Sequence, residues 1–276
     1  MSQTKHAGVI GWPIEHSRSP LIHGHWLKCY GIDGTYTKQA VKPEDFATFV
    51  RSFAERGFVG ANVTVPHKEA AFALADVVEP AARAVGAANT LWLEGDKLHA
   101  TNTDTDGFMR HLDLSAPGWK LKGRPAAILG AGGAARAIAY GLLEAGVSEV
   151  RLFNRTRNRA DALAEHFGTK VRVYDWFERE RLISDACVLV NTTTLGMAKS
   201  APLDISLASL RADAVVVDIV YVPLETQLLK QAAARGLRTV DGLGMLLHQA
   251  VPGFEKWFGV RPQVTPELRD LVVRDL

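Results

Sequence analysis

The first part of the chain alternates short apolar runs with segments of helical periodicity. Runs rich in β-branched and aromatic residues predict strands at 7–11, 35–41, 60–63 and 90–93. Apolar residues at helical spacing predict helices at 20–29, 43–56 and 68–75, and a proline begins each of the first two. This alternation indicates an α/β domain.

The second part of the chain carries strand-like runs that are apolar throughout, as is typical of strands buried on both faces of a parallel sheet. These runs lie at 126–129, 149–154, 188–191 and 214–218. Helical segments at 134–145 and 223–235 lie between them. We therefore expect a doubly wound parallel sheet in this region.

Residues 115–124 combine proline, glycine and charge between these two regions, which is typical of an interdomain connection. We expect one domain at 1–114 and a second at 115–242. The remainder, 243–276, is expected to form helices that pack back onto the first domain. One such helix is predicted at 244–257, and Thr265 is the predicted N-cap of a last one.

Length and composition agree with two globular domains. The chain has 276 residues, of which 47% are hydrophobic and 22% charged, and these values are ordinary for such a protein. The net charge of +2 argues against a nucleic-acid-binding protein, which needs a clustered basic face, and favours small anionic ligands. The oligomeric state stays open, with a homodimer as one alternative.

Cysteines and apolar runs bear on the compartment. Cys29 and Cys187 do not form a disulfide framework or a metal-binding pattern, which favours a reducing cytoplasm. The N-terminal residues lack the pattern of a signal peptide. Glycines, Arg136 and Glu144 interrupt the apolar stretch at 125–147, so no membrane span is expected. No metal site is expected either, because the histidines at 16, 23, 25 and 67 lack zinc-ligand spacing.

A glycine-rich turn joins the strand at 126–129 to the next helix. Its pattern G-x-G-x-x-A, carried by Gly130, Gly132 and Ala135, is that of a dinucleotide-binding βαβ unit of the Rossmann type. The first glycine permits a tight turn, the second lets the backbone approach a pyrophosphate, and the helix N-terminus attracts the anion. The alternative is an ordinary turn of small residues. The expected contact residues are Gly130, Ala131, Gly132, Gly133 and Ala134.

The residues after the next strand select the cofactor. An NAD-binding domain places an acidic residue there for the ribose hydroxyls, whereas this chain reads Asn-Arg-Thr-Arg-Asn-Arg at 154–159. Guanidinium groups suit a 2′-phosphate, so NADP(H) is the expected cofactor. The alternative is a solvated basic helix start, to which Arg157 would belong. The residues expected at the 2′-phosphate are Asn154, Arg155, Thr156 and Arg159.

Two serines in the first domain form a candidate anion site. Ser17 and Ser19 directly precede a helix that begins with proline, where their hydroxyls and the helix dipole could hold a carboxylate. The alternative is that they serve only as an N-cap and a turn residue.

Lys68 and Asp104 are the candidate catalytic pair. A lysine desolvated in a site can act as acid or base, or as the cation that stabilises an alkoxide, and the sequence does not separate these roles. Asp104 could accept a substrate hydroxyl and orient Lys68. The alternative for Lys68 is an exposed lysine at a helix start. Further polar residues of the same loops are Asn62, Thr64 and Asn89.

Motifs along essentially the whole chain resemble those of the shikimate dehydrogenase family, in the family's order and approximate spacing. They are 13–20 (PIEHSRSP), 62–68 (NVTVPHK), 86–90 (GAANT), 102–104 (NTD), 130–136 (GAGGAAR), 154–159 (NRTRNR) and 242–250 (GLGMLLHQA). Gly24, Ala88 and Thr105 depart from residues common in the family, but they lie beside the polar positions rather than on them.

The resemblance implies an oxidoreductase of aromatic amino acid biosynthesis that reversibly reduces 3-dehydroshikimate to shikimate with NADPH. It implies a substrate-binding catalytic domain at 1–114 and an NADP-binding Rossmann domain at 115–242. It also implies that Lys68 and Asp104 are catalytic and that Gly242 contacts the cofactor. The implied carboxylate-binding residues are Ser17, Ser19 and Tyr221, and the implied hydroxyl-binding residues are Asn62, Thr64, Asn89, Asp104 and Gln249.

Two other functions stay open. A quinate/shikimate or an aminoshikimate dehydrogenase would share most of these motifs, although the paired serines and the basic residues after the second strand favour shikimate. An NADP-sensing binding protein without catalysis would have little reason to keep Lys68 and Asp104 together with the hydroxyl-rich loops.

Overall fold

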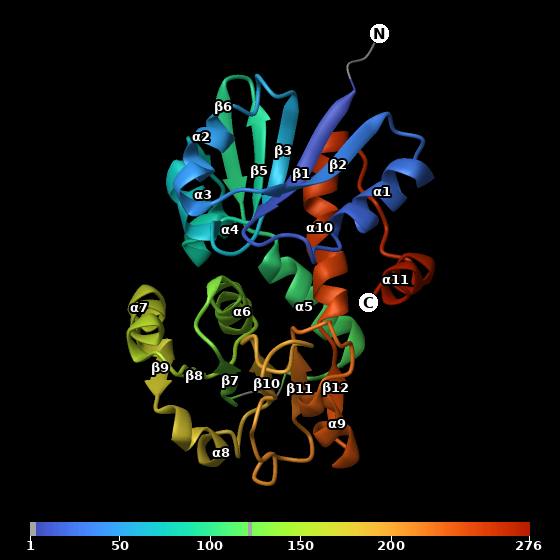
Figure 1. The fold of residues 1–276 in the computed structure, drawn as a ribbon. Helices are drawn as coiled ribbons and strands as arrows, with labels where there is room; N and C mark the ends of the chain where they lie inside the picture. Colours follow the sequence, from blue (N-terminus) through green and yellow to red (C-terminus); the bar gives the residue numbers. More distant parts are fainter. Residues whose placement is uncertain (1–3, 121–122) are drawn as a thin grey trace. The chain divides into compact units, whose positions relative to one another are not determined.

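The computed structural model describes residues 4–120 and 123–276 and divides into two compact units (Figure 1). The first unit contains the chain up to Asp104 together with Leu247–Asp275, and the second contains Thr105–Leu246. Each unit is an α/β fold built on its own sheet, which confirms the predicted fold class. Among the described residues, no helix is long and apolar enough to cross a membrane.

The first unit is built on a mixed sheet of order β2-β1-β3-β5-β6-β4. Strand β1 pairs in parallel with β2 and β3, whereas β5 is antiparallel to both β3 and β6. The carboxyl ends of β3 and β6 therefore lie at the same edge of the sheet as the amino end of β5. The strands are β1 (Lys5–Gly11), β2 (Gly34–Ala40), β3 (Phe58–Val63), β4 (Val77–Val78), β5 (Thr90–Glu94) and β6 (Lys97–Thr101).

Helices cover both faces of this sheet (Figure 1). Successive side chains of a strand point to opposite faces, so Ala61 and Val63 of β3 join the apolar core beneath α2, α3 and α4, while the Gly60 position faces Trp257 of α10. The helices and 3-10 turns are α1 (Ser19–Cys29), η1 (Pro43–Asp45), α2 (Phe46–Arg51), α3 (Lys68–Leu74), α4 (Pro80–Val85), α10 (Leu243–Phe258) and α11 (Pro266–Val273).

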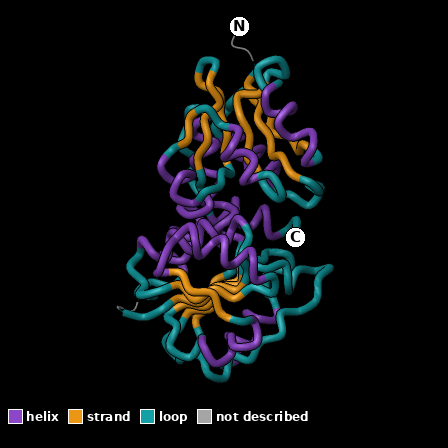
Figure 2. Tube along the Cα trace, turned by 90° about the vertical axis from the view of Figure 1, so that its left-hand side faces the viewer, coloured by secondary structure: helices purple, strands orange, loops and turns teal. Residues whose placement is uncertain are grey.

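The second unit is built on a parallel sheet of order β12-β11-β10-β7-β8-β9. When the six strands are renumbered from β7 as the first and the sheet is read from β9 to β12, the order is 3-2-1-4-5-6, that of doubly wound dinucleotide-binding folds. This confirms the predicted parallel sheet. Strands are drawn in orange in Figure 2. The strands are β7 (Ala126–Leu129), β8 (Val150–Phe153), β9 (Val171–Tyr174), β10 (Val188–Asn191), β11 (Val215–Asp218) and β12 (Arg238–Val240).

Two apolar cores lie on the two faces of the second sheet. Ala126 and Ile128 of β7 point into a core shared with α5, α6 and α7. Ala127 and Leu129 point into the other core, shared with α8 and α9. The helices and 3-10 turns are α5 (Asp104–Ser115), α6 (Gly133–Glu144), α7 (Arg157–Phe167), η2 (Gly168–Lys170), η3 (Trp176–Glu178), α8 (Arg179–Leu182) and α9 (Gln227–Ala234).

The division between the units differs from the boundary expected between residues 114 and 115, because it falls after Asp104. Phe108 and Leu112 of α5, and Trp119 beyond it, are buried in the core of the second unit. The segment 115–124 is therefore not a simple connection, and its residues 121–122 lie outside the described residues. The chain re-enters the first unit at Leu247, within α10.

Several predicted elements change in length. The helix expected at 43–56 is a 3-10 turn followed by α2, which ends at Arg51. The helix expected at 223–235 begins only at Gln227, because Thr226 is its N-cap and accepts the backbone N–H of Leu229. The predicted N-cap Thr265 is confirmed, since its side chain accepts the N–H of Leu268. Other elements were not predicted, among them α4, α8 and the strands β4, β6, β9 and β12; β6, β9 and β12 have no continuous apolar run.

A buried carboxylate organises the carboxyl edge of the second sheet. Asp218, the last residue of β11, has no exposed surface. It accepts hydrogen bonds from the side-chain amide of Asn191 (3.0 Å), the backbone N–H of Val220 (3.0 Å) and the hydroxyl of Thr226 (2.7 Å). Burial raises the pKa of Asp218 to about 6, because the three hydrogen bonds only partly offset the cost of burying the charge.

This raised pKa predicts a pH-dependent stability. The folded state holds the Asp218 proton more tightly than the unfolded chain, so the stability it provides is complete below the ordinary value of 3.8 and is lost as pH rises through about 6. Asp218→Asn keeps an accepting oxygen and cannot ionise. Relative to the unsubstituted protein, its free energy of unfolding should therefore rise by about 1–3 kcal/mol between about pH 4 and pH 7. Urea unfolding across this range measures the difference, and parallel profiles would contradict the shift.

Candidate active site

Polar residues gather at one edge of the first sheet. Asn62 lies in β3, Asn89 directly precedes β5, and Asp104 follows β6 at the start of α5. The sheet topology brings these strand ends to the same edge, although they are far apart in sequence. Lys68 reaches this edge from the first residue of α3, the helix that follows β3.

Lys68 and Asp104 form an ion pair between the Lys68 Nζ and the Asp104 Oδ2 atoms. Their side chains are only 16% and 7% exposed. The other carboxylate oxygen of Asp104 accepts a hydrogen bond of 2.9 Å from the side-chain amide of Asn89. The backbone N–H of Asp104 donates to Asn102 Oδ1 at 3.0 Å. Asp104 is thus held in place on three sides, and the Lys68 ammonium has two further protons to donate.

Asn89 connects this pair to α10. Its amide nitrogen also donates to Thr103 Oγ1 (3.0 Å) and Gln249 Oε1 (3.3 Å). Its amide oxygen accepts the backbone N–H of Thr103 (2.8 Å) and the hydroxyl of Thr90 (3.0 Å). The Thr103 hydroxyl donates to the backbone carbonyl of Gln249 at 2.8 Å. The structure therefore brings Gln249, which is distant in sequence, beside the predicted catalytic pair.

Asn62 is buried and its amide has partners on both sides. Its nitrogen donates to the Asn89 carbonyl and to Thr90 Oγ1, both at 3.2 Å. Its oxygen accepts the hydroxyl of Tyr36 at 2.7 Å.

The serines and Thr64 lie at the same end of the first unit's strands. Ser19 is the first residue of α1 and is buried, whereas Ser17 and Thr64 are half-buried. The Ser17 hydroxyl accepts the backbone N–H of Ser19 at 3.3 Å, which agrees with the turn role considered for it. A hydroxyl that accepts one hydrogen bond can still donate its proton, so this contact leaves Ser17 able to bind an anion.

The glycine turn of the second unit leaves the N-terminus of α6 open, as a bound pyrophosphate would require. Gly130 has φ of +109°, and a side chain there would lie 2.5 Å from Thr192 Oγ1. At Gly132, the N-cap of α6, an added Cβ would meet nothing within 4 Å, and no side chain caps the helix. The first N–H groups of α6, at Gly133 and Ala134, thus begin a helix whose N-terminus can accept a phosphate. These residues fit the expected dinucleotide.

The arginines that follow β8 differ in whether they form an ion pair with a carboxylate. Arg157 forms ion pairs with Asp175 (2.8 Å) and Asp161 (3.7 Å). Arg155 and Arg159 are exposed and have no carboxylate partner within 4–120 and 123–276. Thr156 is the N-cap of α7, and its carbonyl accepts the Asn154 amide at 2.7 Å. The two unpaired guanidinium groups fit a bound 2′-phosphate better than Arg157 does.

Two predicted contact residues lie elsewhere in the second unit. Tyr221 follows β11, so it does not belong to the unit that contains Ser17 and Ser19. Gly242 precedes α10, and a side chain there would overlap the backbone carbonyl of Ile219. Close backbone packing is therefore a structural reason for this glycine. The contact of Tyr221 with the substrate carboxylate and that of Gly242 with the cofactor both stay predictions.

Sequence reasoning missed Tyr36 and Thr103 as partners of the predicted site residues. Thr103 falls inside the Asn-Thr-Asp motif, so its neighbours were a signal for it. Tyr36 lies in a strand with no motif, and the nearest signal was its aromatic ring among polar residues of β2.

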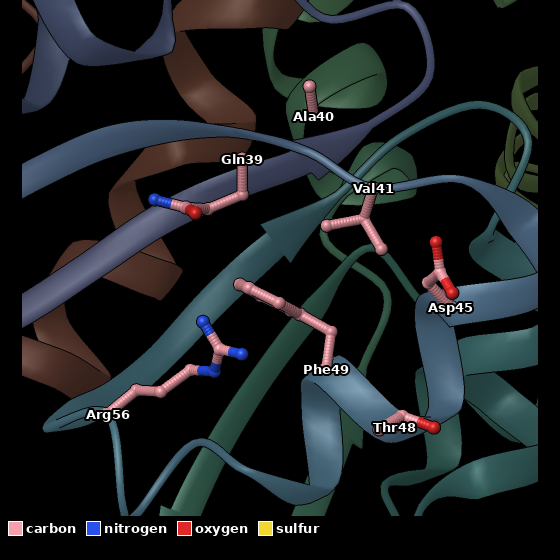
Figure 3. A pocket seen from close by; sticks show the side chains of 7 residues that line it. All are labelled: Gln39, Ala40, Val41, Asp45, Thr48, Phe49 and Arg56. Carbon is pink, nitrogen blue, oxygen red and sulfur yellow. The ribbon is translucent and has the colours of Figure 1, made fainter.

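A surface pocket of about 360 Å³ lies beside β2 and α2 and is separate from the polar cluster (Figure 3). None of the predicted site residues lines it; its lining residues are Gln39, Ala40, Val41, Asp45, Thr48, Phe49 and Arg56. Among the described residues, no three His, Cys, Asp or Glu side chains are arranged to hold a metal ion.

Family models match most of the chain. The model described as shikimate dehydrogenase substrate binding domain matches residues 9–91. The model described as shikimate / quinate 5-dehydrogenase matches 112–241, and the shikimate 5′-dehydrogenase C-terminal domain matches 242–266.

Individual proteins agree with these models. Shikimate dehydrogenase (NADP(+)) of Azorhizobium caulinodans is 56% identical, over 99% of this chain and 97% of its own. Shikimate 5-dehydrogenase of Thermus thermophilus, solved with NADP(H) and shikimate, has a TM-score of 0.86 at 36% identity, covering 98% of this chain and 99% of its own. Quinate dehydrogenase of Corynebacterium glutamicum, solved with NAD, has a TM-score of 0.90 at 32% identity and the same coverage. On the sequence motifs, the fold and these matches, the chain belongs to the shikimate dehydrogenase family.

Proposed function

We propose that this protein catalyses the reversible reduction of 3-dehydroshikimate to shikimate with NADPH, as a step of aromatic amino acid biosynthesis. The observation that carries the proposal is the shielded Lys68–Asp104 ion pair within a network of amides and hydroxyls. The reaction adds a hydride to a ketone carbon and a proton to its oxygen, and NADPH supplies the hydride when bound.

The substrate carboxylate is assigned to Ser17 and Ser19. Both hydroxyls can donate to it, and the N-terminus of α1 adds a partial positive charge. Tyr221 of the second unit is proposed as a further donor.

The ring hydroxyls are assigned to the amide network around Asp104. Lys68 has protons left to donate, and hydrogen bonds to Asn89 and Thr90 hold the Asn62 amide in place. Asn89 and Gln249 already share a hydrogen bond, so a substrate hydroxyl would join an ordered network rather than create one. The proposed hydroxyl-binding residues are Asn62, Thr64, Asn89, Asp104 and Gln249.

Lys68 is proposed to interact with the substrate oxygen that is a ketone in 3-dehydroshikimate and a hydroxyl in shikimate. Its ammonium can donate a proton to the developing alkoxide and stabilise the negative charge on it. Asp104 holds the ammonium, and Asn89 holds Asp104, so the position of the charge is set before the reaction begins. Such preorganisation lowers the cost of reorganising the site in the transition state.

The second unit is proposed to hold NADP(H) along the carboxyl edge of its sheet. Gly130 to Ala134 would approach the pyrophosphate with backbone N–H groups and small side chains. Arg155 and Arg159, with Thr156 and Asn154, would surround the 2′-phosphate, and Gly242 is proposed as a further contact. We also propose a cytoplasmic location, which the free thiols of Cys29 and Cys187 support.

Steady-state kinetics of the purified protein test the proposal. Oxidation of shikimate with NADP⁺ should give a kcat/KM at least about tenfold above that for quinate with NADP⁺ and for shikimate with NAD⁺. The quinate arm is needed because a quinate dehydrogenase shares the fold at a TM-score of 0.90. Faster turnover of quinate would support that alternative, and cofactor binding without turnover of either substrate would overturn the enzymatic function.

Lys68→Ala tests the catalytic pair. Removing the ammonium leaves the alkoxide without its proton donor, so kcat should fall by about 10²–10⁴-fold, with a smaller change in KM for shikimate. Lys256→Ala is the matched control, because Lys256 is also paired with a carboxylate, that of Glu79 at 2.8 Å, but has no proposed role. Retained turnover in Lys68→Ala would remove Lys68 from the mechanism.

Arg155→Asp tests the assignment of the 2′-phosphate. The exchange replaces attraction by repulsion, so KM for NADP⁺ should rise by about 10- to 100-fold while KM for NAD⁺ changes little. Arg157→Asp is the control, since that guanidinium is already paired with Asp161 and Asp175. An equal loss for both cofactors in Arg155→Asp would contradict the assignment.

A further inference from the structure

Tyr36 is a buried tyrosine on an otherwise exposed strand. Strand β2 lies at the edge of the first sheet, and within it Tyr36 is the buried residue, at 8% exposure, while its neighbours are half-buried or exposed. No motif that led to the proposed function includes it. Its hydroxyl nevertheless ends among residues assigned to the substrate.

The direction of the hydrogen bond between Tyr36 and Asn62 follows from the surroundings of the Asn62 amide. The amide nitrogen of Asn62 faces the Asn89 carbonyl, and a flipped amide would put two oxygen atoms against each other there. The Asn62 oxygen must therefore face Tyr36, so the Tyr36 hydroxyl donates its single proton to it at 2.7 Å. Burial raises the pKa of Tyr36 well above its ordinary value, so the donor keeps its proton.

The side chain of Ser19 also lies beside the Tyr36 hydroxyl, and its influence lowers the pKa of Tyr36 against the larger effect of burial. Because the only Tyr36 proton goes to Asn62, the Ser19 hydroxyl can interact with the Tyr36 oxygen only as a donor. A serine hydrogen can turn from Tyr36 to a carboxylate while Oγ stays in place. Tyr36 thus holds the Ser19 oxygen in position without preventing Ser19 from donating to a bound anion.

Aromatic packing fixes the ring that carries this hydroxyl. His23 of α1 stacks on Tyr36 with ring centroids 3.9 Å apart and planes 7° apart, and Trp257 of α10 lies at 5.9 Å. His23 is itself fully buried against Trp26 and Phe254. Burial lowers the pKa of His23 to about 3, and a contact with the Asn62 side chain offsets this only in part. The stacked imidazole is therefore neutral and the ring environment apolar.

The hydroxyl is the part of Tyr36 that packing does not explain. Phenylalanine would fill the same aromatic environment without burying a polar group, and a buried hydroxyl is costly unless it is hydrogen-bonded. Ser19 and Asn62, the two groups beside this hydroxyl, are both proposed substrate contacts. Ser19 is assigned to the substrate carboxylate and Asn62 to a ring hydroxyl.

We propose that Tyr36 is a positioning residue for substrate recognition: its hydroxyl fixes the carboxylate-binding Ser19 and the hydroxyl-binding Asn62 relative to each other. The spacing between these two groups sets which ring carboxylates fit. This inference rests on the proposed function, since it takes Ser19 and Asn62 to bind the two ends of the substrate.

Tyr36→Phe, which removes only the hydroxyl oxygen, tests the inference. In an enzyme that oxidises shikimate, KM for shikimate should rise about tenfold, the effect of losing one buried hydrogen-bonding group. The substitution leaves Lys68 and the cofactor residues in place, so kcat should stay within about threefold and KM for NADP⁺ should not change. A merely structural role would lower the thermal unfolding midpoint and leave KM for shikimate as it was, and this result would overturn the inference.

Tyr30→Phe is the matched control. It removes a hydroxyl from the same unit, where Tyr30 accepts the Gln263 N–H at 3.3 Å, away from the proposed substrate contacts. Its KM for shikimate should equal that of the unsubstituted protein.

A double-mutant cycle supplies a test that does not need Tyr36→Phe to fold. If Tyr36 links the two ends, the effects of Ser19→Ala and Asn62→Ala on KM for shikimate will be non-additive by about threefold or more. Additive effects would overturn the inference while the proposed function stands. Absence of shikimate oxidation by the unsubstituted protein would instead overturn both.

Discussion

The ion pair between Lys68 and Asp104 is the interaction on which the arrangement of the first unit's polar edge depends. Two charges shielded from water are costly unless further hydrogen bonds complete their surroundings. Here Asn89 donates to the carboxylate and Asn102 accepts the backbone N–H of Asp104. Asn89 is in turn bound by Thr90, Thr103 and Gln249. The requirement to satisfy one buried pair thus explains why polar residues of β5, α10 and the loop after β6 converge.

The second unit meets the same requirement in a different way. Asp218 is fully buried, and its partners are a side-chain amide, a backbone N–H and a hydroxyl, all of which are neutral. Because none of these partners is a cation, burial favours the protonated form of Asp218 over the carboxylate, and its pKa rises to about 6. What this network provides is order: it joins the ends of β10 and β11 to the start of α9, at the edge where a doubly wound sheet binds its dinucleotide.

The proposed recognition of the substrate and that of the cofactor 2′-phosphate rely on different kinds of interaction. Most of the proposed substrate contacts belong to a largely buried network of amides and hydroxyls around Asp104, and the aromatic residues around Tyr36 and His23 support one side of it. The proposed 2′-phosphate contacts, Arg155 and Arg159, are exposed guanidinium groups that need no such support. A buried hydrogen-bonded network gives geometric selectivity, because each unmatched group loses a partner, whereas exposed cations provide mainly charge attraction.

The sequence by itself determined the local features: the two α/β regions, the parallel order implied by apolar strands, the turn at Gly130 and the basic residues after β8. These features follow from short-range rules of periodicity, backbone conformation and charge, which neighbouring residues suffice to specify. It also determined the candidate pair Lys68 and Asp104, through family motifs. Only the tertiary structure decided that α5 packs with the second unit, that Gln249 contacts Asn89, and that Tyr36 lies between Ser19 and Asn62. These contacts depend on which strand ends share an edge of the sheet and on which helix face is buried. They join residues far apart in sequence, so no local sequence pattern predicts them.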